Sequence, residues 1–87
     1  MQPIKEFLDR IKWDPRERAD EYVLFYLDRI ERRLKPLKYR DIIRREGIFI
    51  VALIDGRETY LPMHRIRKAE KSGRTVWQRQ SLVNLGQ

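Results

Sequence analysis

The clearest apolar pattern lies near the N-terminus. Four apolar residues follow the helical spacing i, i+3, i+4 and i+7: Ile4, Phe7, Leu8 and Ile11. Pro3 suits a first helical position, and Pro15 disfavours helical backbone angles at the residue before it. The pattern therefore predicts an amphipathic helix that begins near Pro3 and ends before Pro15.

The second apolar segment has two interpretations. Six consecutive apolar residues at 22–27 are rich in aromatic and β-branched types, which favours a short buried strand. Under a helical interpretation, Asp20 caps the helix and its apolar side consists of Val23, Leu27, Ile30 and Leu34. We favour a strand over 22–29, and we expect Lys35-Pro36 to end whichever element precedes it.

The strongest strand pattern follows in the middle of the chain. Residues 48–54 are apolar throughout, so both faces of this strand should be covered and the strand should lie centrally in its sheet. Residues 39–46, just before it, are compatible with one or two helical turns. Ile42 and Ile43 would then face inward.

Two hairpins are predicted after the central strand. Asp55-Gly56 is typical of a two-residue hairpin turn, and a return strand over 57–61 should end where Pro62 interrupts pairing. The second hairpin comprises residues 63–71 and 74–80 around Ser72-Gly73. A two-residue turn there pairs Lys71 with Arg74, Glu70 with Thr75, Lys68 with Trp77 and Ile66 with Arg79.

Strand alternation in that second hairpin predicts two sets of side chains. One face would carry His64, Ile66, Lys68, Trp77 and Arg79. The other would carry Arg65, Arg67, Ala69, Val76 and Gln78. A slip of one residue would exchange the two sets.

These elements predict an α+β fold, with the N-terminal helix packed on a mainly antiparallel sheet of about four to five strands. The chain has 87 residues, which is too short for a second core, so residues 1–80 should form a single domain. We expect residues 81–87 to form a flexible tail.

The distribution of charge along the chain indicates a function. The formal net charge is +7, and residues 32–87 carry fourteen basic and five acidic side chains. A basic half on a small domain predicts binding to a polyanion, most commonly a nucleic acid. A heat-adapted surface with ion-pair networks is the alternative, because 38% of the residues are charged. That alternative accounts less well for the basic excess of residues 32–87.

Several function classes are excluded or disfavoured by composition. The chain has no cysteine, which excludes disulfides, thiolate metal sites and a cysteine nucleophile. It has one histidine, so a single chain cannot supply a pair of imidazoles. Its four glycines are scattered and form no phosphate-binding loop. No apolar run or signal-peptide pattern indicates a membrane, so we expect a cytoplasmic protein without a metal or cofactor.

Basic residues crowd the second predicted hairpin, around the single histidine. An imidazole beside guanidinium groups can bind a phosphate or a ribose hydroxyl, and it could also serve in acid–base catalysis. The alternative for His64 is a strand histidine bonded to backbone. Arg29 either pairs with a carboxylate such as Asp28 or points at an anion. The candidate nucleic-acid-binding residues are Arg29, His64, Arg65, Arg67, Lys68 and Arg79, whereas we assign Tyr26 and Trp77 to the core.

Four short motifs in this order resemble one known family. They are Ile11-x-Trp13-Asp14-Pro15, Tyr26-x-Asp28-Arg29, Leu61-Pro62-x-His64-Arg65-Ile66 and Gly73-x-x-Val76-Trp77-x-Arg79. Together they span nearly the whole chain, and they resemble the RNA cyclic-group end-recognition domain family, which is common in archaea.

The resemblance implies an α+β domain that binds RNA and recognises 2′,3′-cyclic phosphate or processed ends. It also implies association with RNA-end-processing enzymes, and it places His64 and Arg65 at the RNA end with Arg29 and Arg79 as further anion contacts. Many archaeal members carry His-Arg where this chain has Asp28-Arg29, which disfavours an enzymatic role.

Three functions follow in order of preference. The first is a non-catalytic module for single-stranded or 3′-terminal RNA. The second is an RNA-end phosphodiesterase or nuclease that uses His64. The third is a protein-interaction subunit of an RNA-processing assembly, which predicts an exposed apolar patch around Phe49, Val51 and Leu53. The sequence leaves the oligomeric state open.

Overall fold

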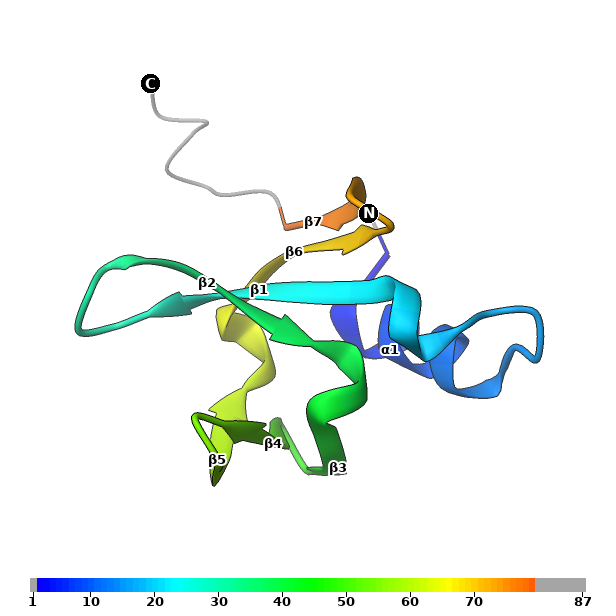
Figure 1. Cartoon of the computed structure of the whole chain (residues 1–87). Coiled ribbons are helices and arrows are strands. Elements are labelled where there is room, and N and C mark those ends of the chain that lie inside the picture. The colour runs from blue at the N-terminus through cyan, green and yellow to red at the C-terminus, as the bar shows by residue number, and fades with distance from the viewer. Residues whose placement is uncertain (1, 80–87) are drawn as a thin grey trace.

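The computed structural model describes residues 2–79. One helix, α1 (Ile4–Trp13), precedes two antiparallel sheets, and Figure 1 shows the sheets one above the other with α1 to one side. The fold is therefore α+β as predicted, but its strands are divided between a four-stranded and a three-stranded sheet. The predicted tail at 81–87 lies outside the described residues.

The four-stranded sheet has the order β2-β1-β6-β7. Its strands are β1 (Tyr22–Asp28), β2 (Arg33–Lys38), β6 (Ile66–Lys71) and β7 (Arg74–Gln78). The strand predicted over 22–29 is confirmed as β1, and the helical alternative is wrong. Tyr22, Leu24 and Tyr26 alternate as buried positions along β1, so one face of this strand belongs to the core.

The three-stranded sheet has the order β3-β4-β5. Its strands are β3 (Ile42–Glu46), β4 (Phe49–Ile54) and β5 (Arg57–Pro62). The apolar segment at 48–54 thus forms a central strand, as predicted. Asp55 and Gly56 have φ values of +53° and +76°, which a two-residue hairpin turn requires and which Gly adopts without strain.

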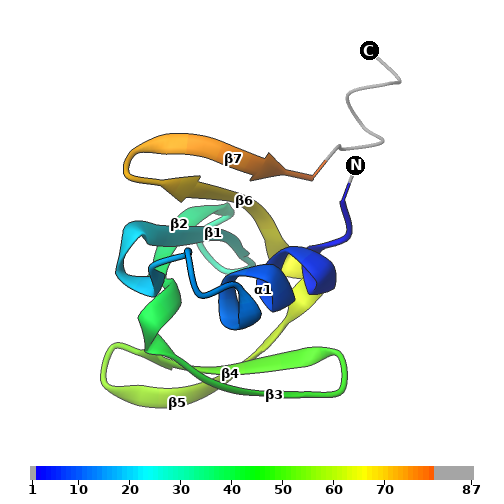
Figure 2. The same ribbon diagram turned by 90° about the vertical axis from the view of Figure 1, so that its right-hand side faces the viewer.

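Two equivalent corners connect the sheets (Figure 2). The first corner (residues 37–43) joins β2 to β3 through the 3₁₀ turn η2 (Tyr39–Asp41). The second corner (residues 61–67) joins β5 to β6 through the 3₁₀ turn η3 (Met63–Arg65). Each turn is followed by an isoleucine with nearly the same backbone angles, φ −75° and ψ 123° at Ile42 and φ −73° and ψ 122° at Ile66.

Helix α1 and both sheets share one hydrophobic core. The apolar side of the helix is buried as its spacing predicts, and Phe7 is fully buried. Its ring lies 5.9 Å from the Tyr22 ring and 6.0 Å from the Trp77 ring, measured between centroids. Tyr26 and Trp77 are core residues as predicted, with exposed fractions of 7% and 5%.

Two predictions around the first corner are wrong. Pro36 does not end the preceding element, because it pairs with Phe25 inside β2. β2 lies at an edge of its sheet, where a residue without an N–H group is tolerated. The helical turns expected over 39–46 are reduced to η2, followed by β3, and Ile43 is 45% exposed instead of facing inward.

The register of the second hairpin is correct only near its turn. Lys71 pairs with Arg74 and Glu70 with Thr75, but a bulge then places Ala69 opposite Trp77 and Lys68 opposite Gln78. A second bulge places Ile66 opposite Tyr26 and Lys68 opposite Phe25, which leaves Arg67 as the extra residue. The predicted faces are therefore correct for Ile66 and Trp77, which are both buried, but wrong for Ala69, which is buried with them.

The outer face of the three-stranded sheet carries apolar side chains. Val51 is fully buried there, whereas Leu53 is 45% and Tyr60 52% exposed. The Phe49 and Tyr60 rings meet edge to face, with centroids 6.1 Å apart. Of the three residues expected in an exposed patch, Leu53 is exposed, Phe49 is half-buried and Val51 is buried, so the patch is smaller than the protein-interaction hypothesis expects. No helix among residues 2–79 is long and apolar enough to cross a membrane.

Candidate functional site

A cavity of about 380 Å³ opens beside the second corner. We call it the arginine cavity, and its lining residues are Leu27, Arg29, His64, Arg65 and Arg67. They come from the end of β1, the loop after it, η3 and the start of β6. Four of the six predicted nucleic-acid-binding residues therefore meet at one place, although 35 positions separate Arg29 from His64 in the sequence.

Arg29 is positioned by a loop that Asp28 organises. One carboxylate oxygen of Asp28 accepts hydrogen bonds from the backbone N–H groups of Ile30 and Glu31, both at 2.8 Å. The other oxygen lies 3.1 Å from the ammonium group of Lys35. The amide of Glu31 and then the Lys35 ammonium hold the pKa of Asp28 below its usual range. Asp28 thus supports the loop, while Arg29 remains free to meet a ligand.

His64 and Arg65 are positioned by the short turn η3. The residues on either side of these two are anchored, because Met63 and Ile66 are buried in the core. The backbone N–H of Met63 also donates to the carbonyl of Ile48 at 2.8 Å. His64 is exposed and Arg65 is half-buried, so the turn presents one imidazole and one guanidinium from a fixed backbone.

Arg67 enters the cavity from the bulge in β6. A bulge residue is not held in the alternation of the strand, so its side chain can be re-aimed. The Nε atom of Arg67 is buried and has no hydrogen-bond partner among the described residues. A buried donor without a partner costs about 1–3 kcal/mol, and such sites call for an explanation. An anion bound at the cavity would provide one.

Arg79 lies next to this cluster but does not line the cavity. Its Nε donates to the carbonyl of Ile66 at 3.0 Å, and its Nη2 donates to the carbonyl of Met63 at 3.3 Å. Burial, and then the charge of Arg67, lower the pKa of Arg79 below its usual range. These two hydrogen bonds therefore stabilise the second corner, and the guanidinium of Arg79 adds positive charge next to the cluster.

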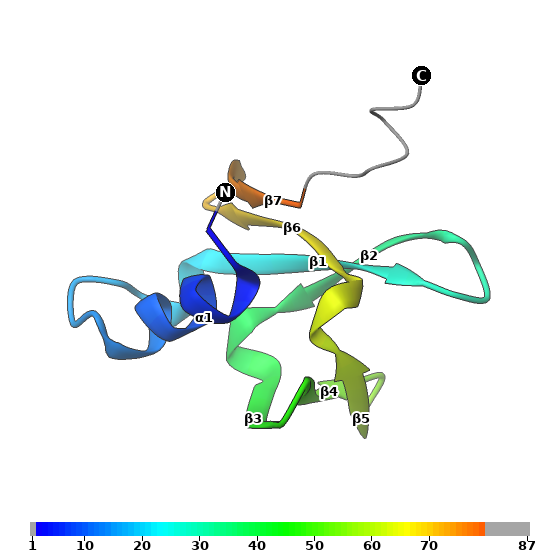
Figure 3. The ribbon, with the colours of Figure 1, turned by 180° about the vertical axis from the view of Figure 1, so that it is seen from behind.

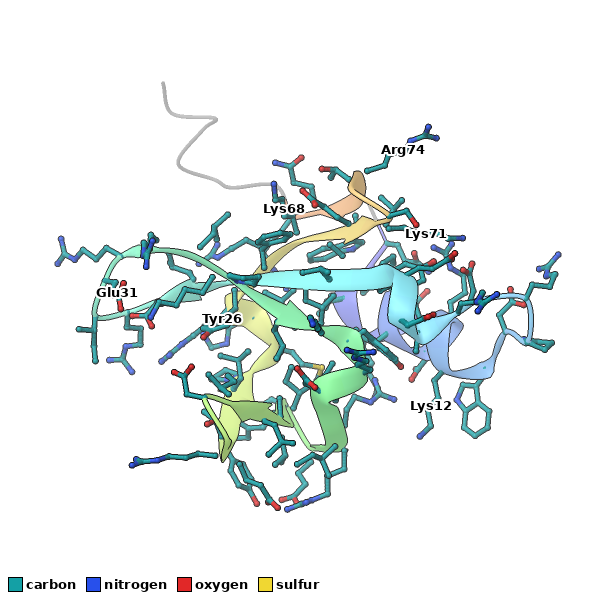
Figure 4. The ribbon with its side chains drawn as sticks, viewed as in Figure 1. Lys12, Tyr26, Glu31, Lys68, Lys71 and Arg74 are labelled. Atoms are coloured by element: carbon teal, nitrogen blue, oxygen red, sulfur yellow. The ribbon has the colours of Figure 1, made fainter. Side chains whose placement is uncertain are left out.

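Lys68 is directed elsewhere. Figure 4 shows Lys68 on the side of the four-stranded sheet away from Tyr26, which points toward the other sheet. The ammonium of Lys68 lies 3.3 Å from a carboxylate oxygen of Glu70 and 4.9 Å from the ring centroid of Phe25. Lys68 is thus paired with Glu70 and does not line the arginine cavity.

The charges of the site have no carboxylate partner in the part of the chain that the structure describes. None of Arg29, His64, Arg65, Arg67 and Arg79 forms an ion pair within residues 2–79. Other cations are paired, including Arg45 with Asp9 and Lys71 with Glu17. Arg29 is exposed and the other three arginines are half-buried. Such a group of guanidiniums attracts an anion, and planar forks of this kind suit the oxygens of a phosphate.

The arrangement offers less to catalysis. His64 forms no hydrogen bond with any residue in the described range, so nothing there orients its imidazole. The described part of the chain also contains no group of three residues able to hold a metal ion. Binding of an anion is the chemistry that these side chains support directly.

Sequence reasoning missed the apolar wall of the site. Leu27 lines the arginine cavity because it alternates with the buried Tyr26 and ends on the other face of β1. The signal was available, since Leu27 lies between Tyr26 and Asp28 within one quoted motif. The apolar pattern at 22–27 predicts a buried strand, so the partly exposed face of this strand was not predicted to contribute to the site.

Comparison with known proteins agrees with the resemblance seen in the motifs. The family model named MJ1316 RNA cyclic group end recognition domain matches residues 1–79. A UPF0248 protein of Pyrococcus horikoshii is 37% identical over 81 residues, which cover 86% of this chain and 87% of that protein. No solved structure matches the chain.

Other relatives carry the same family designation. A UPF0248 protein of Pyrococcus abyssi is 35% identical over 81 residues, covering 86% of this chain and 87% of the relative. A UPF0248 protein of Saccharolobus solfataricus is 28% identical over 81 residues, covering 87% and 95%. The similarity to archaeal proteins thus extends along almost the full length of both partners.

Proposed function

Since the chain belongs to the MJ1316 RNA cyclic group end recognition domain family, we propose that it binds RNA ends at the arginine cavity. The bound group is a terminal phosphate, and the 2′,3′-cyclic phosphate is the form that the family name indicates. The observation that supports this proposal most directly is that three guanidiniums and one imidazole line a single cavity. None of them has a carboxylate partner among the described residues.

The chemistry of the cavity supports a phosphate in particular. A cyclic phosphate has two free oxygens that share one negative charge, which matches the bidentate fork of a guanidinium. Arg67 is half-buried, so a hydrogen bond from its unpartnered Nε would be made in a partly desolvated setting, where charge–charge attraction is stronger than in water. His64 can donate to a phosphate oxygen or contact the sugar.

The first experiment measures affinity for short RNAs that differ only in their 3′ end. We expect the cyclic phosphate to bind more tightly than a hydroxyl end by about 10-fold or more, because a neutral hydroxyl offers no negative charge to the guanidinium groups. Three cationic contacts predict a log–log salt slope of about −2 on a single strand. Equal affinity for both ends would contradict end recognition.

A matched pair of variants tests the location. Arg65→Ala should weaken binding of the cyclic end by about 10-fold or more and reduce the salt slope by about 0.7. Arg40→Ala is the control, because Arg40 follows Tyr39 in the first corner as His64 follows Met63 in the second. Equal losses from both variants would show nonspecific attraction to a basic surface and would contradict the assignment.

The enzymatic alternative is tested in the same samples. A phosphodiesterase or nuclease would convert an oligonucleotide with a cyclic end, and His64→Ala would abolish the product while binding largely survived. We expect no product over hours with either protein. Turnover that depends on His64 would replace the binding proposal with a catalytic one.

A further inference from the structure

A second cavity adjoins the arginine cavity. It has a volume of about 560 Å³ and lies between the loop after β1 and the strand β5. We call it the inter-sheet cavity, and its walls include Tyr26, Arg29, Ile30, Ile54, Leu61 and Arg65. Figures 1 and 3 show this loop and β5 on the side of the molecule away from α1. Its size lies within the range of cavities that hold small organic ligands.

The two cavities share two of their residues. Arg29 and Arg65 line both, so the two cavities are neighbours that meet at these two residues. A ligand with its anionic group in the arginine cavity would therefore extend its remaining part into the inter-sheet cavity. That part would meet the apolar side chains Ile54 and Leu61, which belong to or pack against the hydrophobic core.

Most polar side chains of the inter-sheet cavity are already engaged. The Asp28 carboxylate accepts from two backbone amides of its own loop. The Tyr60 hydroxyl donates to Glu46 at 3.2 Å, and the Thr59 hydroxyl donates to a backbone carbonyl at 3.3 Å. These groups are therefore less available to a ligand than the remaining hydroxyl, that of Tyr26.

Tyr26 differs from the others in the wall. The residue is only 7% exposed, yet its hydroxyl forms no hydrogen bond with any residue from 2 to 79. Burial raises the pKa of Tyr26, so the hydroxyl stays protonated and remains a donor at neutral pH. Its hydroxyl is not among the fully enclosed side-chain atoms of the described residues, so it is accessible from the cavity and can donate to a ligand atom there.

We propose that the inter-sheet cavity holds the base and sugar of the terminal nucleotide, with the Tyr26 hydroxyl bonded to a polar edge of the base. This inference rests on the proposed function, because the arginine cavity must hold the phosphate of the same nucleotide. A base presents flat apolar faces to Ile54 and Leu61, and the planes of Arg29 and Arg65 can stack on it. The pair of cavities then recognises a nucleotide and not merely a phosphate.

The test compares ligands with and without a base. Calorimetry on the full chain measures binding of a nucleoside 2′,3′-cyclic phosphate and of the corresponding ribose cyclic phosphate that lacks the base. We expect the nucleotide to bind at least about 10-fold more tightly, because its base buries apolar faces against the cavity wall. The ligand without a base should still bind, since its phosphate contacts are unchanged.

Two tyrosine variants locate the contact. Tyr26→Phe keeps the buried ring and removes only the hydroxyl, so it should weaken nucleotide binding by about 5-fold and leave the ligand without a base unaffected. Tyr39→Phe is the control, because it removes a hydroxyl that lies 3.5 Å from the Leu8 carbonyl at the first corner. That variant should leave both affinities unchanged.

The outcomes separate this inference from the proposed function. Equal affinity of both ligands, with no effect of Tyr26→Phe on either, would overturn the nucleoside assignment while the phosphate site stands. Failure of both ligands to bind would overturn the proposed function itself. A phosphoserine peptide that binds as tightly as the nucleotide would also overturn the inference, because such a peptide has no base for Tyr26 to contact.

Discussion

The two corners have the same backbone but differ in how the charged side chains beside them are paired. Each consists of a 3₁₀ turn, a buried or partly buried isoleucine and a residue beyond it that is extra in the strand pairing. That extra residue is Ile43 at the first corner and Arg67 at the second. The same backbone arrangement therefore presents an apolar side chain at the first corner and a cationic side chain at the second.

The surroundings of the corners explain the difference. At the first corner Asp9 of α1 pairs with Arg45, and Arg44 pairs with Glu46 at 2.5 Å. At the second corner no carboxylate pairs with the cluster in the part of the chain that the structure describes. A charged side chain that is paired with a neighbour contributes to the fold, whereas an unpaired charged side chain in a cavity is available to bind a ligand. The following predictions test that contrast.

The largest expected effect concerns the isoleucines that anchor the corners. Ile66 is fully buried, so Ile66→Ala should lower the free energy of unfolding by about 3–4 kcal/mol through lost burial and a cavity. Ile42 is only partly buried against the core, and Ile42→Ala should cost about half as much. Urea denaturation measures both losses.

Ile66→Val provides a milder variant in case the alanine variant does not fold. It should cost about 1 kcal/mol, since it removes one methyl group from the same site. If Ile42→Ala proved as damaging as Ile66→Ala, the second corner would not be the more deeply anchored one.

The next effect concerns charge at equivalent positions. Arg65 and Asp41 both end their 3₁₀ turns, so Arg65→Asp gives the second corner the residue of the first. Affinity for a cyclic-phosphate RNA end should fall by about 100-fold, because an attraction is replaced by repulsion. Arg40→Asp makes the same substitution in the first corner and should cost less than about 3-fold. A similar loss in both variants would contradict the contrast between the corners.

Local signals in the sequence predicted much of the fold. The helix spacing, the apolar segment at 48–54 and the turn dipeptides Asp55-Gly56 and Ser72-Gly73 each encode an element within a few residues. Pro36 in β2 was missed because its tolerance depends on which edge of a sheet the strand occupies. That information comes from tertiary pairing and is absent from the local pattern.

The site was predictable as a cluster but not in its geometry. The motif resemblance grouped Arg29, His64, Arg65 and Arg79, and the charge pattern of the second predicted hairpin added Arg67. All of these except Arg79 line one cavity. The bulges could not be foreseen, because they arise from the match between β6 and both of its neighbours. They decide that Arg67 enters the cavity and that Lys68 leaves it.

A smaller effect separates stability from binding. Arg67→Met removes an unpartnered buried donor and the repulsion of Arg79, so it should raise the free energy of unfolding by up to about 1 kcal/mol. The melting temperature should then rise by up to about 4–8 °C while affinity for the RNA end falls about 10-fold. Arg45→Met removes a cation paired with Asp9 and should change stability by less than about 1 kcal/mol in the unfavourable direction. A destabilised Arg67→Met protein would show that Arg67 serves the fold and not the ligand.

The smallest effect is a dependence of binding on acid pH. The pKa of Asp28 is lowered in the folded chain, so the support that its carboxylate gives to the Arg29 loop is complete above the ordinary pKa of an aspartate. That support is lost as the pH falls through the lowered value, because a protonated carboxyl no longer attracts Lys35 and accepts the loop amides less well. Affinity for a uridine cyclic phosphate, whose base and phosphate do not titrate in this range, should fall by about 3-fold in acid before the protein unfolds.

Asp28→Asn separates this titration from all others in the chain. The amide oxygen of asparagine can still accept the backbone N–H groups of Ile30 and Glu31, so binding at neutral pH should change by less than about 3-fold. The acid-dependent loss should disappear, since the side chain at position 28 no longer ionises. Titration of nucleotide affinity by calorimetry, with circular dichroism to monitor folding, distinguishes the two proteins. If the acid transition persisted unchanged in the variant, the loop would not owe its position to the charge of Asp28, and Arg29 would be held at the second corner by another contact.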